Sequence, residues 1–240
     1  MTTLDPLAGT LHALAQTGLT LTHSLRARGG RRTIELAALA FGLPALAEHQ
    51  LVNRFELLRH HAQPQMQGVP LLALLSWYNV TYPSFALVEG LLAAAPLSPS
   101  ARRWATPVGS ALVATSIDLL LDVVGLEQGI WEWSADGPYA PEISGPNGKR
   151  GIPLLNFVGW LGLVGSVTAI DLLRHPAAGA DTASAGNASS AAATRTAALL
   201  LLPYYGVGAA SAVRGVRLRT LAYSALAPAA IALGLTRRAT

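Results

Sequence analysis

Residues 104–160 read WATPVGSALVATSIDLLLDVVGLEQGIWEWSADGPYAPEISGPNGKRGIPLLNFVGW, and this stretch decides both the fold and the candidate site. Its first apolar run carries two carboxylates, Asp118 and Asp122, four residues apart. A polar loop follows, and a second apolar run opens near Asn156. Acidic groups inside an apolar run are costly in a membrane, so their presence indicates a functional reason.

The composition of the whole chain is typical of an integral membrane protein. Of its 240 residues, 51% are hydrophobic and only 12% are charged, which is about half the charged fraction usual in soluble domains. The mean hydropathy is +0.39. Cysteine is absent, which excludes disulfides, thiolate metal sites and a cysteine nucleophile. The basic residues lie in short arginine runs between apolar segments, as at membrane flanks, and no basic face indicates nucleic-acid binding.

The sequence predicts an all-α fold, a polytopic membrane bundle that forms one domain over residues 1–240. A catalytic four-span core is expected at 33–173, followed by a flexible Ala/Ser/Gly-rich linker at 174–195 and two spans within 196–240. About six segments are long enough to cross about 30 Å of hydrocarbon at about 1.5 Å per residue. They are 33–52, which we expect Pro44 to break, 68–95, 104–126, 151–173, 196–213 and 218–236. We expect a multi-pass protein of the cell membrane, specifically of a bacterial plasma membrane.

The N-terminal region, residues 1–32, is predicted to be one more helix followed by a basic turn. Between residues 4 and 25 apolar residues recur at three- and four-residue steps, which is the pattern of one apolar helix face. Two placements are open, an amphipathic helix in the membrane interface and an additional span. We favour the interfacial helix.

Acidic residues from separate predicted spans fall at a similar depth. Alternation of the spans puts the connections 53–67 and 127–150 on one side of the membrane, called here the loop face. Glu48 lies in the loop-face half of its span. Asp118 and Asp122 lie about 21 and 27 Å along theirs at helical rise, in the same half. We therefore expect the three carboxylates to share one region.

Asp118 and Asp122 are spaced i, i+4 and so share a helix face. Two acids held close in a low dielectric cannot both ionise cheaply, so one should remain protonated and act as an acid near neutral pH. Asn156 enters its span from the same face and is the fourth catalytic candidate, beside Glu48. The competing interpretation is structural, with each carboxylate paired to a loop arginine or accepting helix-terminal hydrogen bonds.

Other acids near apolar segments have a simpler interpretation. Glu35 lies beside Arg31 and Arg32, and Asp171 lies beside Arg174. We expect each to form an ion pair at a helix end, where such a pair costs little.

Aromatic and amide side chains accompany the acids and are the candidates for substrate binding. They are Trp77, Tyr78, Asn79, Trp131, Trp133, Tyr139 and Trp160. One interpretation is an aromatic belt at the membrane interface. For Trp131 and Trp133 this interpretation and a role in substrate binding are equally open. The alternative is a cage whose ring faces stabilise a transient carbocation. Trp77 and Trp160 suit that role better, because they lie well inside their spans.

The pair His60 and His61 in ELLRHH raises the question of a metal site. Membrane di-iron hydroxylases use several histidine clusters, whereas this sequence has one such pair. We predict that both are surface histidines of a connecting loop and expect no metal.

Several blocks together resemble the carotenoid 1,2-hydratase family of integral membrane proteins. They are GVPLLALLSWYNVTYPSF, IDLLLD, GIWEW, GPY and GIPLLNFVGW, which lie within about residues 42–173. The combination of paired aspartates with the downstream tryptophans and Asn156 carries most of the specificity. Two departures are visible: Val123 stands where the family commonly has proline, and an insertion separates Tyr139 from Gly151.

The resemblance implies a cofactor-independent hydro-lyase acting on the acyclic end of a carotenoid such as γ-carotene, lycopene or bisanhydrobacterioruberin. A carboxylic acid protonates C2, a tertiary cation forms at C1, and water captures it to give a tertiary alcohol. Asp118 is the expected acid, Asp122 or Glu48 would position the water, and Asn156 would support it. The expected partners are the carotenoid, water, the lipid bilayer and other carotenoid biosynthesis enzymes.

Two alternatives remain open at this point. A carotenoid cyclase or isomerase would share the acid and the cation but exclude water. A transporter or membrane scaffold would use the intramembrane carboxylates as proton or ion relays. The absence of a convincing internal repeat disfavours a secondary transporter.

Overall fold

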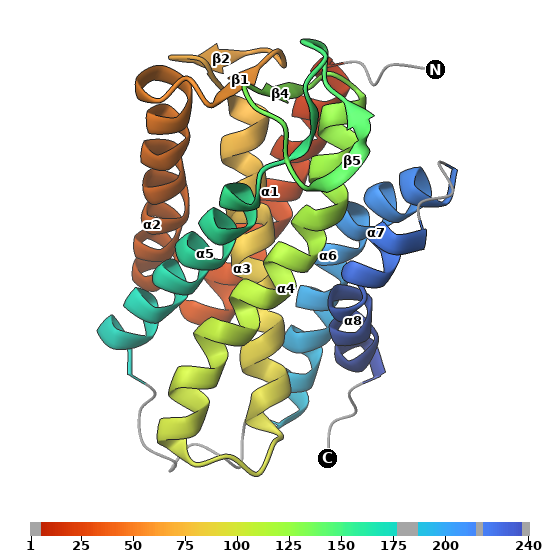
Figure 1. Cartoon of the computed structure of the whole chain (residues 1–240). Helices are drawn as coiled ribbons and strands as arrows, with labels where there is room; N and C mark the ends of the chain where they lie inside the picture. Colours follow the sequence, from red (N-terminus) through yellow and green to blue (C-terminus); the bar gives the residue numbers. More distant parts are fainter. Residues whose placement is uncertain (1–5, 177–186, 215–217, 237–240) are drawn as a thin grey trace.

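The computed structural model describes residues 6–176, 187–214 and 218–236, in which eight helices form an elongated bundle with short strands over one end (Figure 1). The helices are α1 (Pro6–Arg28), α2 (Gly30–His49), α3 (Leu71–Ala93), α4 (Pro99–Glu127), α5 (Leu154–Arg174), α6 (Asn187–Arg214), α7 (Leu218–Tyr223) and α8 (Leu226–Thr236). A π-helical turn, η1 (Gln50–Arg54), follows α2. Because α3 packs against α1, α2, α4, α6 and α8, it forms the centre of the bundle.

Three helices, α3, α4 and α5, are long and apolar enough to cross a membrane. In their most apolar windows 72% of α3 and α4 is buried, against 33% of α5. The outward side of α5 is apolar, with Leu155, Val158 and Leu161 exposed, as expected of a lipid-facing surface. The helical membrane bundle is therefore supported, with three clear spans. The last predicted span, 218–236, is divided into α7 and α8, and α8 reaches only about 16 Å at helical rise.

Helix α1 packs lengthwise against α3 as a member of the bundle, so the interfacial placement is wrong. It runs beside α3 from Thr10, which bonds to the Gln63 carbonyl, to Arg28, which pairs with Glu89 of α3. Its small polar residues face inward, while the leucines expected to face a protein or membrane surface point outward, with Leu11 56% exposed. Small polar residues allow close helix packing where lipid supplies the apolar surroundings, which explains this arrangement.

Two further predictions about helix boundaries are corrected. Pro44 does not break its helix, because α2 continues through it to His49. The predicted linker 174–195 is shorter than expected, because α6 begins at Asn187. Residues 177–186 of that linker lie outside the described residues.

The loop face carries strands, so the all-α prediction needs correction there. Three two-stranded antiparallel ladders, named here the cap, lie over the ends of α2 to α5 (Figure 1). They are β1 (Leu58–His60) with β4 (Trp131–Trp133), β2 (Gln65–Met66) with β3 (Val69–Pro70), and β5 (Tyr139–Ser144) with β6 (Arg150–Ile152). The first ladder joins the two connections that the sequence placed on one side. The insertion between Tyr139 and Gly151 forms the third.

The third ladder depends on a glycine at Gly151. Its φ is +70°, and an added Cβ would collide with the Gly137 carbonyl oxygen. Gly148 also has a positive φ, +80°, but faces open space.

We expect Gly151→Ala to loosen the cap, destabilising the protein by about 1–3 kcal/mol, the usual cost of backbone strain at such a position. Gly148→Ala carries the conformational strain without the collision and should cost less. Limited proteolysis between β5 and β6, with thermal unfolding in detergent, measures the difference. Equal behaviour of the two variants would contradict the role assigned to the close contact.

Candidate active site

The two aspartates of α4 are joined by one amide from α5. Asn156 Nδ2 donates to Asp118 Oδ2 at 2.8 Å and to Asp122 Oδ2 at 2.7 Å. Each aspartate is 4% exposed, so exposure does not distinguish the acid predicted to be deeper. Because both amide hydrogens of Asn156 are used, the two carboxyl groups are held together at a fixed spacing.

Glu48 joins this cluster from the end of α2. Its Oε1 accepts a hydrogen bond from Trp77 Nε1, and its Oε2 lies 3.1 Å from His60 Nε2. The residue is 9% exposed and lies within electrostatic range of both aspartates. The structure thus brings together all four residues that the sequence proposed as catalytic, here named the acid cluster.

Trp77 and Trp160 stand beside the acid cluster, but they stack on each other. Their ring centroids are 3.7 Å apart and the ring planes differ by 17°. Each ring gives one face to the other, so only the outer faces remain for a cation. The pair is therefore a wall, not a cage open on both sides.

The cap supplies the other three aromatic candidates. Trp131 packs closely over Gly125 of α4, and Trp133 is 2% exposed in the apolar core under the cap. The Tyr139 hydroxyl donates to the Leu119 carbonyl at 2.9 Å. Burial raises the pKa of Tyr139, and the nearby Asp118 adds to that shift, so the hydroxyl stays neutral.

Tyr78 and Asn79 lie away from the acid cluster. Tyr78 is fully buried and stacks on Phe41 of α2, with 5.2 Å between the centroids. Asn79 donates to the Ala13 carbonyl of α1 at 3.1 Å. Both side chains hold α3 against its neighbouring helices.

His60 is the functional candidate that sequence reasoning missed. The prediction of two surface histidines is wrong for it, because its side chain is 3% exposed and bound to Glu48. His61 is partly exposed and lies 3.4 Å from Glu132. In the structure His60 lies on the buried face of β1, whose three residues are buried, exposed and buried in turn, but a strand this short gives no reliable signal in the sequence. Among the described residues, no group of three or more metal-ligating side chains accompanies these histidines.

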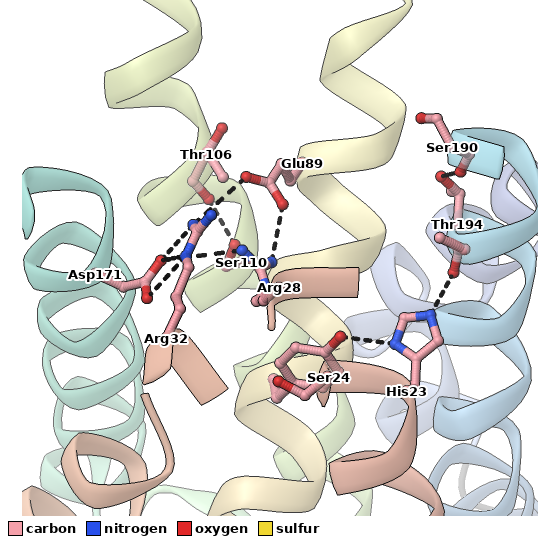
Figure 2. Close-up of polar contacts among 12 residues, drawn as sticks. His23, Ser24, Arg28, Arg32, Glu89, Thr106, Ser110, Asp171, Ser190 and Thr194 are labelled. Carbon is pink, nitrogen blue, oxygen red and sulfur yellow. Dashed lines mark hydrogen bonds and ion pairs between the residues drawn. The ribbon is translucent and has the colours of Figure 1, made fainter. Parts of the chain in front are cut away.

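A second polar cluster lies at the opposite end of the bundle (Figure 2). Arg32 Nε donates to both oxygens of Asp171, at 3.2 and 3.0 Å, and Arg28 pairs with Glu89 at 2.8 Å. The prediction that Asp171 pairs with Arg174 is therefore wrong, because its partner is Arg32. Asp171 finds its partner on α2, which packs against α5, and not in Arg174 three residues further along its own helix.

Glu35 at that end forms the ion pair that the sequence predicted. Its carboxylate lies 2.9 Å from Arg31 Nε, and His175 adds a contact at 3.0 Å. This pair is at the surface of the bundle, unlike the Arg32–Asp171 pair.

Two cavities lie outside the acid cluster. A cavity of about 450 Å³ at the loop face is lined by residues that include Asn53, Arg59 and Glu132. Another of about 230 Å³, at the opposite end, is lined by residues that include Arg28 and Glu89.

These features define a helical membrane protein with buried acids at one end of its bundle. The chain belongs to the carotenoid biosynthesis protein family, whose family model matches residues 9–233. That match confirms the carotenoid family resemblance and extends it from the motif blocks to α1 and the C-terminal helices. No curated protein and no solved structure matches the chain significantly.

Proposed function

We propose that this protein hydrates the acyclic end of a carotenoid, adding water across the terminal C1–C2 double bond. The observation that carries the proposal is the acid cluster itself. Asp118 and Asp122 are buried, are tied by one amide, and have Glu48 close by. Three carboxyl groups in one apolar place favour a shared proton, and a carboxyl that keeps its proton can protonate an alkene.

The acid cluster has an apolar surface on one side, which suits a carotenoid, and the solvent-facing cap on the other, which suits water. Around Asn156, the residues Leu154, Leu155 and Val158 are exposed on α5, where a polyene in the bilayer would meet the protein. The cap lies on the other side and faces solvent. We infer that the carotenoid approaches through lipid and that water comes from the loop face.

The proposed reaction balances without a redox cofactor. Asp118 gives its proton to C2, and the C1–C2 electron pair forms the new C–H bond, which leaves a tertiary cation at C1. Water bonds to C1 and releases one proton to a base in the site. That proton returns to Asp118 through the neighbouring carboxylates, so the enzyme ends as it began. In this mechanism the cation at C1 is stabilised by the outer face of Trp77 or Trp160, which stack on each other through their inner faces.

Isotope incorporation tests this proposal directly. The purified protein in detergent, given lycopene in ²H₂O, should yield a carotenol with one deuterium at C2 for each reacted end. In H₂¹⁸O, the hydroxyl at C1 should carry the label. Mass analysis of the pigments measures both.

The outcomes also separate the alternatives. A cyclase or isomerase would take up deuterium without gaining the mass of water. A transporter or scaffold would leave the carotenoid unchanged. Either result would contradict hydration.

A further inference from the structure

Two buried ring nitrogens lack protein partners beside the acid cluster. His60 Nδ1 and Trp131 Nε1 have no hydrogen-bond partner among the residues that the structure describes. Their rings meet edge to face with 6.2 Å between the centroids. Buried polar atoms are normally satisfied, and an ordered water is the usual partner where the protein supplies none. The two nitrogens thus leave one free hydrogen-bonding position each for a small polar ligand.

The bond to Glu48 determines what His60 offers to that ligand. Glu48 accepts from Trp77 through Oε1 and lies 3.1 Å from His60 Nε2 through Oε2. A carboxylate that accepts on both oxygens requires the proton of the neutral imidazole to sit on Nε2. His60 Nδ1 then presents a lone pair, which accepts a hydrogen and can remove a proton.

Trp131 supplies the complementary donor. Its indole lies close over Gly125, one turn of α4 beyond Asp122, and its N–H interacts with the Asp122 carboxylate from beyond ordinary hydrogen-bond distance. A ligand that accepts from Trp131 and donates to His60 would therefore sit at the edge of the acid cluster. Water has both functions.

The β1–β4 ladder lies between the acid cluster and the cavity at the loop face. Arg59 pairs with Glu132, and His60 pairs with Trp131, in adjacent positions of the two strands. Successive residues of a strand point to opposite faces. Arg59 and Glu132 line the 450 Å³ cavity at the loop face, whereas His60 faces Glu48 in the bundle. One thin ladder thus separates the solvent cavity from the acid cluster.

We propose that His60 and Trp131 bind the reacting water, and that His60 is the general base which removes its proton; this rests on the proposed hydration. The Trp131 N–H donates to the water oxygen, and one water O–H donates to His60 Nδ1. As the oxygen bonds to C1, that O–H breaks and its proton passes to Nδ1. Glu48 stabilises the imidazolium, as a carboxylate does for a catalytic histidine. The proton then returns through the carboxylates to Asp118.

His60→Gln tests this role, because its amide can still donate to Glu48 but cannot accept a proton. The protein is incubated with lycopene in ²H₂O. We expect hydration to fall about 10²-fold or more, the usual contribution of a general base. Deuterium should still appear at C2 of unhydrated carotenoid, because Asp118 forms the cation and the cation then loses a proton. His61→Gln, the adjacent and partly exposed histidine, serves as the matched control and should hydrate normally.

A second variant keeps the test decisive if His60→Gln folds poorly. Trp131→Phe preserves the ring over Gly125 and removes only the N–H, so it should also shift the product from alcohol to deuterated alkene. Full hydration by His60→Gln would overturn the proposal. So would a folded His60→Gln protein that loses deuterium uptake as well as hydration, because His60 would then support the acid and not the water. If the wild-type protein neither hydrates nor incorporates deuterium, hydration itself fails.

Discussion

Replacing Asp118 by asparagine is expected to reduce hydration of an acyclic carotenoid by about 10²–10⁴-fold, the range that a general acid contributes. Asparagine has nearly the same shape, and its amide oxygen can still accept from Asn156. It carries no transferable proton, so C2 is not protonated. Deuterium uptake at C2 should fall together with the alcohol, which distinguishes this variant from His60→Gln. Expression in a lycopene-producing bacterial host, followed by mass analysis of the pigments, measures the loss.

The control for this variant removes a carboxylate at a harmless place. Glu142 lies exposed on β5, so Glu142→Gln should leave both hydration and protein level unchanged. An Asp118→Asn protein made at normal level that hydrates at the wild-type rate would contradict the assignment of Asp118 as the acid.

Replacing Asp171 by asparagine is expected to give the largest loss of stability. The Asp171 side chain is 1% exposed and binds Arg32, with Arg28 4.0 Å away and 4% exposed. Removing one partner leaves buried positive charge without its counterion, which costs about 3 kcal/mol at the lower end of the usual range, because Glu89 remains near both arginines. For a chain of this size, the unfolding midpoint should fall by on the order of 10 °C. Thermal unfolding followed by circular dichroism in detergent measures it.

The loss of stability expected for Asp171→Asn depends on the burial of its ion pair. Glu35→Gln also removes a carboxylate from an arginine at the same end of the bundle, but Arg31 is 88% exposed there. Exposed ion pairs contribute little, so its unfolding midpoint should stay near that of the wild type. A double variant, Asp171→Asn with Arg32→Gln, should lose less than the two single changes together, because the unpaired charge is gone. Additive losses would contradict the buried pair.

The sequence predicted a helical bundle and the end of the bundle at which the acids lie, because both depend on local information. Apolar length identifies α3, α4 and α5, and the rise per residue places Asp118 and Asp122 toward the loop face. The sequence-based predictions failed where the partner or the burial of a side chain depends on a residue far away in the chain. The partner of Asp171 is 139 residues away in the chain, at Arg32. His60 looked like a surface residue because a strand of three residues carries almost no pattern.

By itself, then, the sequence determined the class of protein, the carotenoid family and the four polar residues worth testing. Composition and i, i+4 spacing are properties of the chain alone, so they do not depend on how the helices pack. Only the tertiary structure decided that Asn156 joins two aspartates, that Glu48 holds His60 and Trp77, and that Trp77 stacks on Trp160. Those contacts link residues from different helices and from the cap. They form because buried polar groups must find partners wherever folding places them, and no spacing rule along the chain specifies which partner that is.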